Sequence, residues 1–415
     1  MKLFTDKNYP IIVSCAKELS RWTELELRDM GYQIVEVTEN TVVVRGDFED
    51  VMKLNLYLRT AHRVLVPLLR AECRNIRDLY NLAKSIDWEN HIDADGYFSV
   101  NSVVHNYTIR DTRLPSLYTK DAIVDRIREK YQRRPDSGSQ NYGAAVFVYW
   151  EDDEVIIYLD TSGEPLSKRG YRKIPGSAPM QETLAAACLM AMKWDCKKPF
   201  VFPMCGSGTP AIEAVMMAMN RAPGLLKGHF AFQSIKGYDK IIPGLKAPVV
   251  APRQYAGATP EQLWKERILA ARAAERTDNL PEIIATDISP EAIENAHSNA
   301  IAAGVASYIK FAACDFADTP IPEEKGFIFF NPEYGIRLGT FEELQPVYQR
   351  MGRFMAEKCA GFTGAIITGN PDLAREVPLY YKTRVPFFNG PIDCRLFIYE
   401  GCELKEARTQ DNGTL

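Results

Sequence analysis

From residue 180 onward, short apolar segments alternate with longer segments of helical periodicity, and no other feature restricts the fold of this 415-residue chain so strongly. Apolar runs of this length suit a buried strand and are too short for a helix. Strands that alternate with helices form a mostly parallel sheet with helices on both faces. The expected strands are Pro199–Phe202, Glu282–Thr286, Tyr308–Phe311, Gly326–Phe330 and Gly364–Thr368. We therefore predict a doubly wound α/β domain, to which Phe387–Phe388 and Leu396–Tyr399 add antiparallel strands.

The first 66 residues have a different order of elements. We expect a strand, a helix, two strands, a helix and a strand, which is the order of a small ferredoxin-like α+β unit. The expected segments are Ile11–Val13, Lys17–Met30, Tyr32–Val37, Thr41–Val44, Asp47–Tyr57 and Arg63–Leu69. We assign residues 1–66 to this unit.

A second mixed segment extends from Arg70 to Asp160. The expected helices are Asn75–Ser85 and Tyr118–Arg134, and the expected strands are Tyr97–Val103, Ala145–Tyr149 and Val155–Leu159. The last two strands flank an acidic turn and form a hairpin. Residues 161–179 are rich in Gly, Ser, Pro and basic side chains, which is typical of a linker.

Composition limits the class of protein. The hydrophobic content of 46% and the charged content of 25% are those of a soluble globular protein. No apolar run reaches about 18 residues and the first ten residues are polar, so we expect neither a membrane span nor a secretory signal. The nine cysteines include no Cys-x-x-Cys pair. This argues against a zinc site and a disulfide framework, and it favours reduced thiols in a cytoplasmic protein without a metal.

The net charge of −4 does not by itself predict nucleic-acid binding. The most basic stretch is Arg110–Arg134, in which Asp and Glu are interspersed. Two interpretations remain for it: a solvated helix face with i,i+4 ion pairs, or a local contact with RNA. If RNA binds, we expect Arg113, Lys120 and, further along the chain, Arg169 to contact it.

A Gly-rich loop follows the first strand of the doubly wound domain. Residues 202–210, Phe-Pro-Met-Cys-Gly-Ser-Gly-Thr-Pro, lie between that strand and a helix that is expected to begin near Pro210. Gly206 and Gly208 permit a tight turn and the close approach of a ligand, and the helix N-terminus offers free N–H groups to an anion. No Gly-Lys-Ser/Thr follows, so a triphosphate loop is not expected. An ordinary strand-to-helix turn is the alternative.

Asp287 ends the next expected strand, and Ile288 follows it. An acidic residue at this position bonds a ribose diol in doubly wound folds, although it can also simply cap the following helix. Asp287 lies much further from Gly208 than the usual ~20 residues. Residues 224–279 are therefore expected to be an insertion, with a helix over residues 259–276.

Asp315 and Phe316 follow the third strand. The carboxylate of Asp315 could accept a hydrogen bond from an adenine amino group, and Phe316 could pack on the ring. A loop aspartate without a ligand is the alternative.

The tetrad Asn331-Pro332-Glu333-Tyr334 follows the fourth strand. The side-chain amide of Asn331 and the carbonyl of Pro332 could accept hydrogen bonds from an exocyclic amine, while the Tyr334 ring could stack on the base. These are the groups that methylation of an amino nitrogen on a base requires. The usual form of the motif has Pro in place of Glu333.

Four such loops at one edge of a parallel sheet are more specific than any one of them. Together they predict a site for an adenosine-bearing cofactor beside a bound base. The candidate cofactor-binding residues are Pro203, Met204, Cys205, Gly206, Gly208, Thr209, Asp287, Ile288, Asp315 and Phe316.

These motifs belong to longer runs that resemble the THUMP-domain class I RNA methyltransferases, most closely the bacterial family that methylates guanine N2 in large-subunit (23S) ribosomal RNA. The shared runs are Tyr118–Asp125, Leu159–Leu166, Lys168–Arg172, Ala178–Pro179, Pro203–Thr209, Arg221–Gly224, Asn331–Leu338, Phe388–Gly390 and Cys394–Leu396. The resemblance implies S-adenosylmethionine as cofactor and RNA as partner. It also implies a THUMP module over residues 67–165 that helps to bind RNA, and a Rossmann-like doubly wound methyltransferase domain over residues 166–405.

The chain departs from the family pattern at two positions. The family has Asp, which helps to hold the methionine end of the cofactor, where this chain has Phe202, and it has Pro where this chain has Glu333. The catalytic groups that the resemblance implies, Asn331, Pro332 and Tyr334, are all present. The alternative is an RNA-binding homologue without catalysis. Transfer RNA in place of ribosomal RNA, and adenine N6 in place of guanine N2, are further alternatives.

Overall fold

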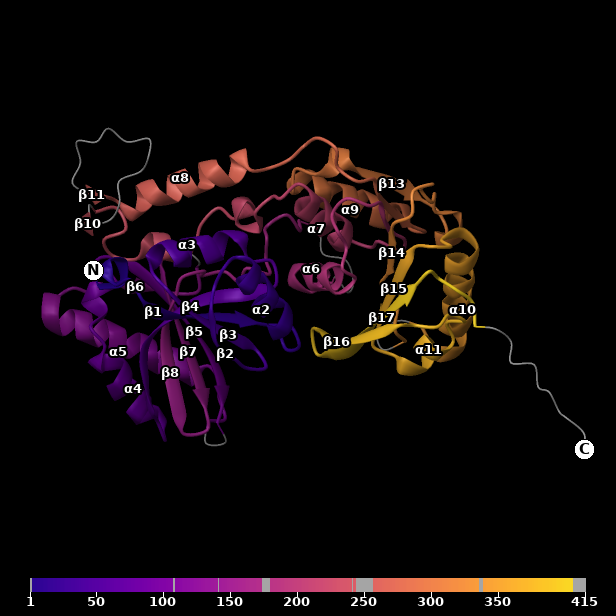
Figure 1. The fold of residues 1–415 in the computed structure, drawn as a ribbon. Helices are drawn as coiled ribbons and strands as arrows, with labels where there is room; N and C mark the ends of the chain where they lie inside the picture. The colour runs from indigo at the N-terminus through magenta and orange to yellow at the C-terminus, as the bar shows by residue number, and fades with distance from the viewer. Residues whose placement is uncertain are drawn as a thin grey trace, which may run out of the picture. The chain divides into compact units, whose positions relative to one another are not determined.

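A computed structural model of the protein describes residues 2–106, 109–140, 142–173, 180–240, 242–243, 257–335 and 339–405. The chain forms two compact units (Figure 1). The N-terminal unit consists of residues 1–169 and 222–275, and the C-terminal unit consists of residues 170–221 and 276–415. The predicted boundaries at residues 66 and 165 remain predictions.

The N-terminal unit is built on one eight-stranded sheet with the strand order β2-β3-β1-β4-β8-β7-β5-β6. Its strands are β1 (Tyr9–Cys15), β2 (Ile34–Val37), β3 (Thr41–Gly46), β4 (Ala61–Glu72), β5 (Tyr97–His105), β6 (Asp136–Ser137), β7 (Ala144–Glu151) and β8 (Glu154–Asp160). The helices between them are α1 (Lys2–Thr5), α2 (Ser20–Asp29), α3 (Phe48–Tyr57), α4 (Ile76–Ser85), the 3-10 turn η1 (Trp88–Asn90) and α5 (Leu114–Tyr131). The ferredoxin-like order of elements predicted for the first 66 residues is confirmed.

Strand β4 belongs to both halves of this sheet. It pairs antiparallel with β1 through Leu65, opposite Ile12, and with β8 along its length, from Leu65 to Glu72. The sequence predicted this strand, at Arg63–Leu69, but not its second partner. The two predicted N-terminal modules therefore share one continuous sheet.

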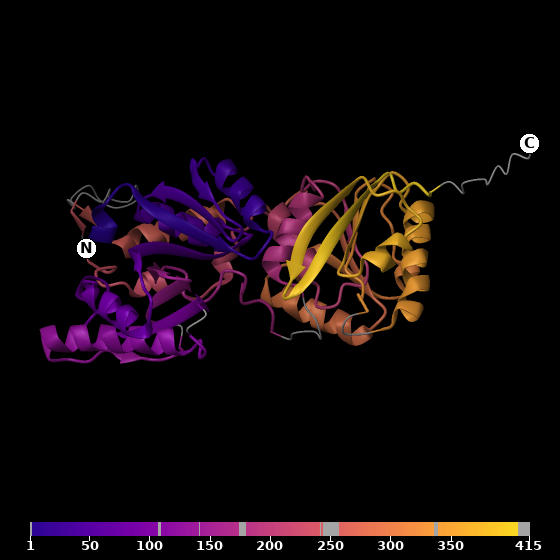
Figure 2. The same cartoon turned by 90° about the horizontal axis from the view of Figure 1, so that it is seen from below.

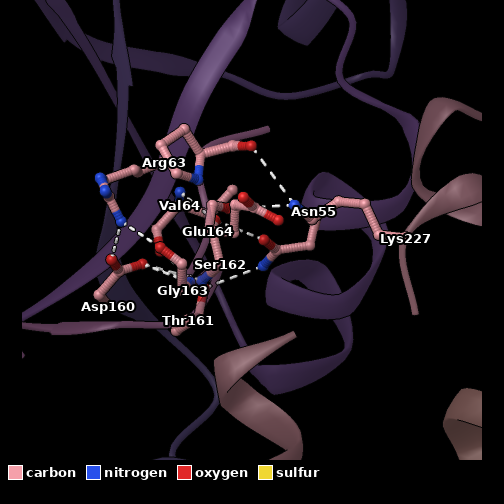
Figure 3. Close-up of polar contacts among 10 residues, drawn as sticks. Asn55, Arg63, Val64, Asp160, Thr161, Ser162, Gly163, Glu164 and Lys227 are labelled. Carbon is pink, nitrogen blue, oxygen red and sulfur yellow. Dashed lines mark hydrogen bonds and ion pairs between the residues drawn. The ribbon is translucent and has the colours of Figure 1, made fainter. Parts of the chain in front are cut away.

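A buried polar network joins β4 to the chain that follows β8 (Figure 3). The Asn55 amide nitrogen donates to Thr161 Oγ1 at 2.9 Å, and Ser162 Oγ donates to Asn55 Oδ1 at 2.6 Å. The backbone N–H of Val64 donates to the Ser162 hydroxyl oxygen at 2.9 Å. Arg63 forms an ion pair with Asp160, which is fully buried. Each buried polar group in this chain of contacts has a protein partner, as burial requires.

Residues 222–275 complete the core of the N-terminal unit. The segment contains η2 (Pro223–Leu226), η3 (Ala231–Ser234), β10 (Ile242–Pro243), β11 (Gly257–Ala258) and α8 (Pro260–Ala273). The ring of Phe232 lies 5.9 Å from Phe48 and 5.0 Å from Trp264, centre to centre. The predicted insertion and its helix are confirmed; the sequence did not reveal that the insertion packs into the N-terminal core.

The C-terminal unit is built on a seven-stranded sheet with the order β13-β12-β9-β14-β15-β17-β16. Its strands are β9 (Phe200–Phe202), β12 (Ile283–Asp287), β13 (Ile309–Ala313), β14 (Phe327–Phe330), β15 (Thr363–Thr368), β16 (Thr383–Asn389) and β17 (Ile392–Glu400). Its helices are α6 (Glu182–Ala191), α7 (Thr209–Ala218), α9 (Pro290–Ala302), α10 (Phe341–Lys358), α11 (Pro371–Arg375) and the 3-10 turns η4 (Ala306–Tyr308) and η5 (Phe316–Asp318). The first five strands in this order are parallel, and β17 and β16 are antiparallel, as predicted.

Helices cover both faces of this sheet (Figure 2). Val201, Ile328 and Phe330 face the core that includes α10 and α11. Their neighbours Phe202 and Phe329 stack on each other at 5.5 Å, and alternation along a strand places them on the opposite face. A sheet buried on both faces explains why its strands are apolar throughout. Among the described helices, none has the length and apolar character that a bilayer crossing needs.

Candidate functional site

The loops that follow β9, β12, β13 and β14 lie at the same edge of the C-terminal sheet. Strand β12 pairs in parallel with β13 on one side and β9 on the other, and β9 pairs in parallel with β14. The carboxyl ends of these strands therefore meet. The structure thus brings together the four loops that the sequence singled out, at the edge where ligands bind in open α/β sheets.

Backbone hydrogen bonds tie the Gly-rich loop to the end of β12. The N–H of Cys205 donates to the Thr286 carbonyl at 2.8 Å, and the N–H of Gly206 donates to Asp287 Oδ2 at 2.9 Å. Both glycines of the loop have positive φ, +51° at Gly206 and +78° at Gly208. A Cβ at Gly206 would meet no atom within 4 Å, whereas one at Gly208 would lie 2.9 Å from Ala296 Cβ. Gly206 therefore faces open space, and Gly208 permits the close approach of α7 and α9.

Arg172 and Asn299 secure the start of α7, and sequence reasoning assigned no role to either. Arg172 Nη2 donates to Thr209 Oγ1 at 3.0 Å and lies 3.4 Å from the Glu182 carboxylate. The Asn299 amide donates to the Ser207 carbonyl at 3.1 Å, and its oxygen accepts from the Lys173 N–H at 3.0 Å. Arg172 lies in a run that supported the family resemblance, which was the available signal. Its positive charge lies beside the helix N-terminus, where an anionic group is favoured.

Asp287 and Ile288 have the exposure that a ligand contact needs. The Asp287 carboxylate accepts from Gly206 and, at 3.0 Å, from the N–H of Ser289, and the residue is partly exposed. Ile288 is 72% exposed, which is unusual for a large apolar side chain. A carboxylate oxygen has more than one lone pair, so Asp287 can accept further hydrogen bonds. The pair offers a hydrogen-bond acceptor for a diol beside an apolar surface for a ring.

Asp315 and Phe316 are more constrained than expected. Asp315 Oδ1 accepts from the N–H of Ala317 at 2.9 Å and from Arg350 at 2.8 Å. The Arg350 guanidinium lies 4.8 Å from the centre of the Phe316 ring, and Phe316 is only 6% exposed. Contact of Phe316 with an adenine ring therefore requires Arg350 to move, and it remains a prediction.

The tetrad is held in place by its backbone as well as its side chains. The Tyr348 hydroxyl donates to the Glu333 carbonyl at 3.0 Å, and the Asn370 amide donates to the Tyr334 carbonyl at 3.3 Å. Tyr334 is 9% exposed, and its hydroxyl donates to Asn331 Oδ1 at 2.6 Å. Stacking of a base on Tyr334 would require this ring to become more exposed. The side chain of Glu333 is exposed to solvent.

The two departures from the family pattern have different environments. Phe202 is fully buried and stacks on Phe329, so it is part of the hydrophobic core. It supplies no charge at the position where the family has Asp. Glu333 lies at the surface of the tetrad and leaves the hydrogen bonds of Asn331 and Tyr334 intact.

The three predicted RNA-binding residues also differ in exposure. The Arg113 side chain is 89% exposed and forms an ion pair with Asp111 at 2.9 Å, which lowers the pKa of that carboxyl to about 2. The Lys120 side chain is 31% exposed. Both remain predicted RNA contacts.

The burial of Arg169 contradicts the prediction that this residue contacts RNA. It is only 1% exposed, and its guanidinium donates to the backbone carbonyls of Leu166 and Arg59. A phosphate cannot reach a buried guanidinium, so the structure gives Arg169 a role in folding the N-terminal unit rather than a surface contact. The composition of the predicted linker suggested exposure, but this residue is packed inside.

The shared run Ala178–Pro179 lies wholly outside the described residues, and so do residues 336–338 of the run Asn331–Leu338. Within the described part of the chain, no group of three or more His, Cys, Asp or Glu side chains is arranged to hold a metal ion.

Comparison with known families matches three successive parts of the chain. Residues 10–65 match an RlmL ferredoxin-like domain, residues 73–160 match a THUMP domain, and residues 169–398 match an RMKL-like methyltransferase domain.

Individual relatives agree with these matches. The chain is 34% identical over 394 residues to the ribosomal RNA large subunit methyltransferase K/L of Psychromonas ingrahamii, covering 93% of this chain and 49% of that protein. It is 30% identical over 397 residues to a putative RNA methyltransferase of Synechocystis, covering 96% of this chain and 98% of that protein. The fold is similar to a crystal structure of a putative methyltransferase complexed with SAH, with a TM-score of 0.81 and 26% identity over 97% of this chain and 100% of that one. The chain thus spans about half the length of the K/L relative and nearly all of the Synechocystis protein.

Proposed function

Because the chain belongs to the family of RMKL-like methyltransferase domains, we propose that it transfers a methyl group from S-adenosylmethionine to an exocyclic amine of an RNA base. The proposed target is guanine N2 of large-subunit ribosomal RNA. The observation that supports this most strongly is the meeting of the Gly-rich loop, Asp287 and the Asn331 tetrad at one edge of the C-terminal sheet.

The residues at this edge fit the proposed cofactor. Gly206 faces open space, the start of α7 and Arg172 favour a carboxylate, Asp287 can accept from a ribose diol, and Ile288 offers an apolar surface. Phe202 contributes no charge, so the methionine end would be held without the acidic group that the family has there. The SAH complex of the similar protein supports the same cofactor.

The tetrad would position the base. Asn331 Oδ1 and the Pro332 carbonyl would accept the two amine hydrogens and direct the nitrogen lone pair toward the cofactor. The bound cofactor supplies a methyl group on a positively charged sulfur, so the protein needs to supply alignment and exclusion of water rather than a strong base. Asn331 is partly buried and Pro332 is buried, which suits the exclusion of water.

The K/L relative and the match to a THUMP domain support ribosomal RNA as the substrate and residues 73–160 as an RNA-binding part. A cytoplasmic location is part of the same proposal. Transfer RNA, and adenine N6 as the acceptor, remain the alternative substrates because the tetrad recognises an amine rather than one particular base.

The test is mass spectrometry of nucleosides from ribosomal and transfer RNA of cells that lack the protein, followed by methylation of that RNA with purified protein. We expect one N2-methylguanosine to be absent from large-subunit RNA and to be restored in vitro. Asn331→Ala should reduce the rate about 100- to 1000-fold because an acceptor of the reacting amine is lost. Asn40→Ala, the same substitution at an exposed turn of the N-terminal unit outside residues 73–160, should leave the rate unchanged.

The competing hypothesis is an RNA-binding homologue without catalysis, which Phe202 and Glu333 would explain. Calorimetric titration with S-adenosylmethionine separates the two. No binding at millimolar cofactor, together with unaltered RNA in cells that lack the protein, would favour the non-catalytic function.

A further inference from the structure

The oxygen of Asn331 that would accept the base amine already accepts a hydrogen bond from within the tetrad. The Tyr334 hydroxyl donates to it at 2.6 Å, while the Tyr334 ring is largely buried. A tyrosine whose only task was to stack on a base would need an exposed ring face and no hydroxyl. The observed contact therefore indicates a different role for this side chain.

The direction of the bond between Tyr334 and Asn331 determines which end of the Asn331 amide faces the base. A side-chain amide has an acceptor oxygen and a donor NH₂ group of nearly equal size, so its orientation is set by its partners. An amide carbonyl oxygen has two lone pairs; the Tyr334 hydroxyl occupies one and leaves the other for an incoming amine. If the amide turned over, its NH₂ group would face the amine of the base, and two donors would oppose each other.

We propose that Tyr334 is a positioning residue: its hydroxyl donates to the Asn331 oxygen and holds that oxygen toward the exocyclic amine of the base. This inference rests on the proposed methyltransferase function and adds the residue that orients its amine acceptor. Tyr348 and Asn370 donate hydrogen bonds to the backbone of the tetrad and hold it in one conformation. The Tyr334 hydroxyl therefore stays within reach of Asn331.

Kinetics of Tyr334→Phe test the proposal, because this change keeps the ring and removes only the hydroxyl. We expect kcat to fall about 10- to 100-fold, with KM for RNA and the Kd for S-adenosylmethionine unchanged. A Tyr334→Phe enzyme with wild-type kcat would overturn the proposal.

A double variant separates orientation from packing. Once Asn331 is Ala, removal of the hydroxyl should cause no further loss, because the two residues act as one unit. Losses that multiply would show that Tyr334 acts independently of Asn331 and would contradict the proposal. Thermal unfolding of each variant identifies any loss that is due to misfolding.

A measurement without turnover keeps this inference distinct from the proposed function. The side-chain amide resonance of Asn331, identified by its absence in Asn331→Ala, should shift in Tyr334→Phe. An unchanged resonance would overturn the hydrogen bond from Tyr334 to Asn331 even if the wild-type protein is an active methyltransferase. An inactive wild-type protein that shows this shift would contradict the proposed function alone.

Discussion

Asp160 in the N-terminal unit and Asp287 in the C-terminal unit each accept hydrogen bonds from two backbone N–H groups. Asp160 accepts from Ser162 at 2.9 Å and Gly163 at 3.0 Å, and it also pairs with Arg63. Asp287 accepts from Gly206 and Ser289 at the same two distances. The kind of donor and the distances are the same, but Asp160 is fully buried among protein groups whereas Asp287 is partly exposed at the carboxyl edge of a sheet.

This difference in burial shows that two backbone N–H donors at a carboxylate do not by themselves define a ligand site. For Asp160, burial raises the pKa, and the charge of Arg63 and the surrounding hydrogen bonds act against that rise. All of its partners are protein groups, so its contribution is to the fold. Asp287 borders solvent beside an exposed apolar side chain, so its remaining lone pairs are accessible to a ligand.

The largest effect should follow from breaking the buried pair. Arg63→Met leaves Asp160 buried without its cation and should lower the free energy of unfolding by about 3–5 kcal/mol. Arg70→Met is a matched control on the same strand, because Arg70 pairs with Glu154 at 2.7 Å but both side chains are largely exposed. It should cost less than about 1 kcal/mol. Equal losses in urea unfolding would contradict the distinction between buried and exposed pairs.

Glu89 is a second buried carboxylate of the N-terminal unit, and its contribution to stability depends on pH. It is 6% exposed, and although burial raises its pKa, hydrogen bonds from Arg126 and Lys130 lower it from 4.5 to about 2. The unfolded chain therefore binds this proton more readily, so the stabilisation is present above pH 4.5 and is lost as the pH falls toward 2. The shift corresponds to about 3 kcal/mol.

Urea unfolding of the wild type and Glu89→Gln between pH 5 and pH 2 measures this contribution. The difference in unfolding free energy between the two proteins should narrow as the pH falls. A difference that is independent of pH would mean that the carboxylate charge is not what stabilises this part of the N-terminal unit.

Of the three effects predicted for carboxylates and their partners, the smallest should come from the partly exposed Asp287. Asp287→Ala should weaken the binding of S-adenosylmethionine about 10- to 100-fold, or roughly 1.4–2.7 kcal/mol, because a charged acceptor of the ribose diol is lost. The melting temperature should change little, in contrast to Arg63→Met. Asp372→Ala, at an exposed position of α11, is the control. Unchanged cofactor affinity in Asp287→Ala would remove Asp287 from the proposed site.

The sequence predicted the elements and the four loops well because each depends on local patterns. Apolar runs such as Phe327–Phe330 marked the strands, and Gly206 and Gly208 marked a turn whose conformation few other residues adopt. The second partner of β4 and the packing of Trp264 against Phe232 depend on contacts between distant parts of the chain. Local periodicity contains no information about such contacts.

Individual side chains were harder to predict than the loops that contain them. Arg169 is basic and lies among Gly, Ser and Pro, yet its guanidinium is enclosed by backbone carbonyls. Tyr334 fits a stacking role by residue type, but its ring is largely buried and its hydroxyl donates to Asn331. Residue type predicts the chemistry that a side chain can perform, while the tertiary partners decide which atom faces the ligand.

Strand β4 links the unfolding of the two N-terminal modules. Val64 and Val66 contribute to the core beneath α3, and Leu68 and Leu69 contact the core beneath α4 and α5. A break in the hydrogen-bonded ladder of this strand would expose both cores to water at once. The two modules should therefore lose structure in a single cooperative transition, and amide hydrogens on either side of β4 should exchange with the same free energy of opening.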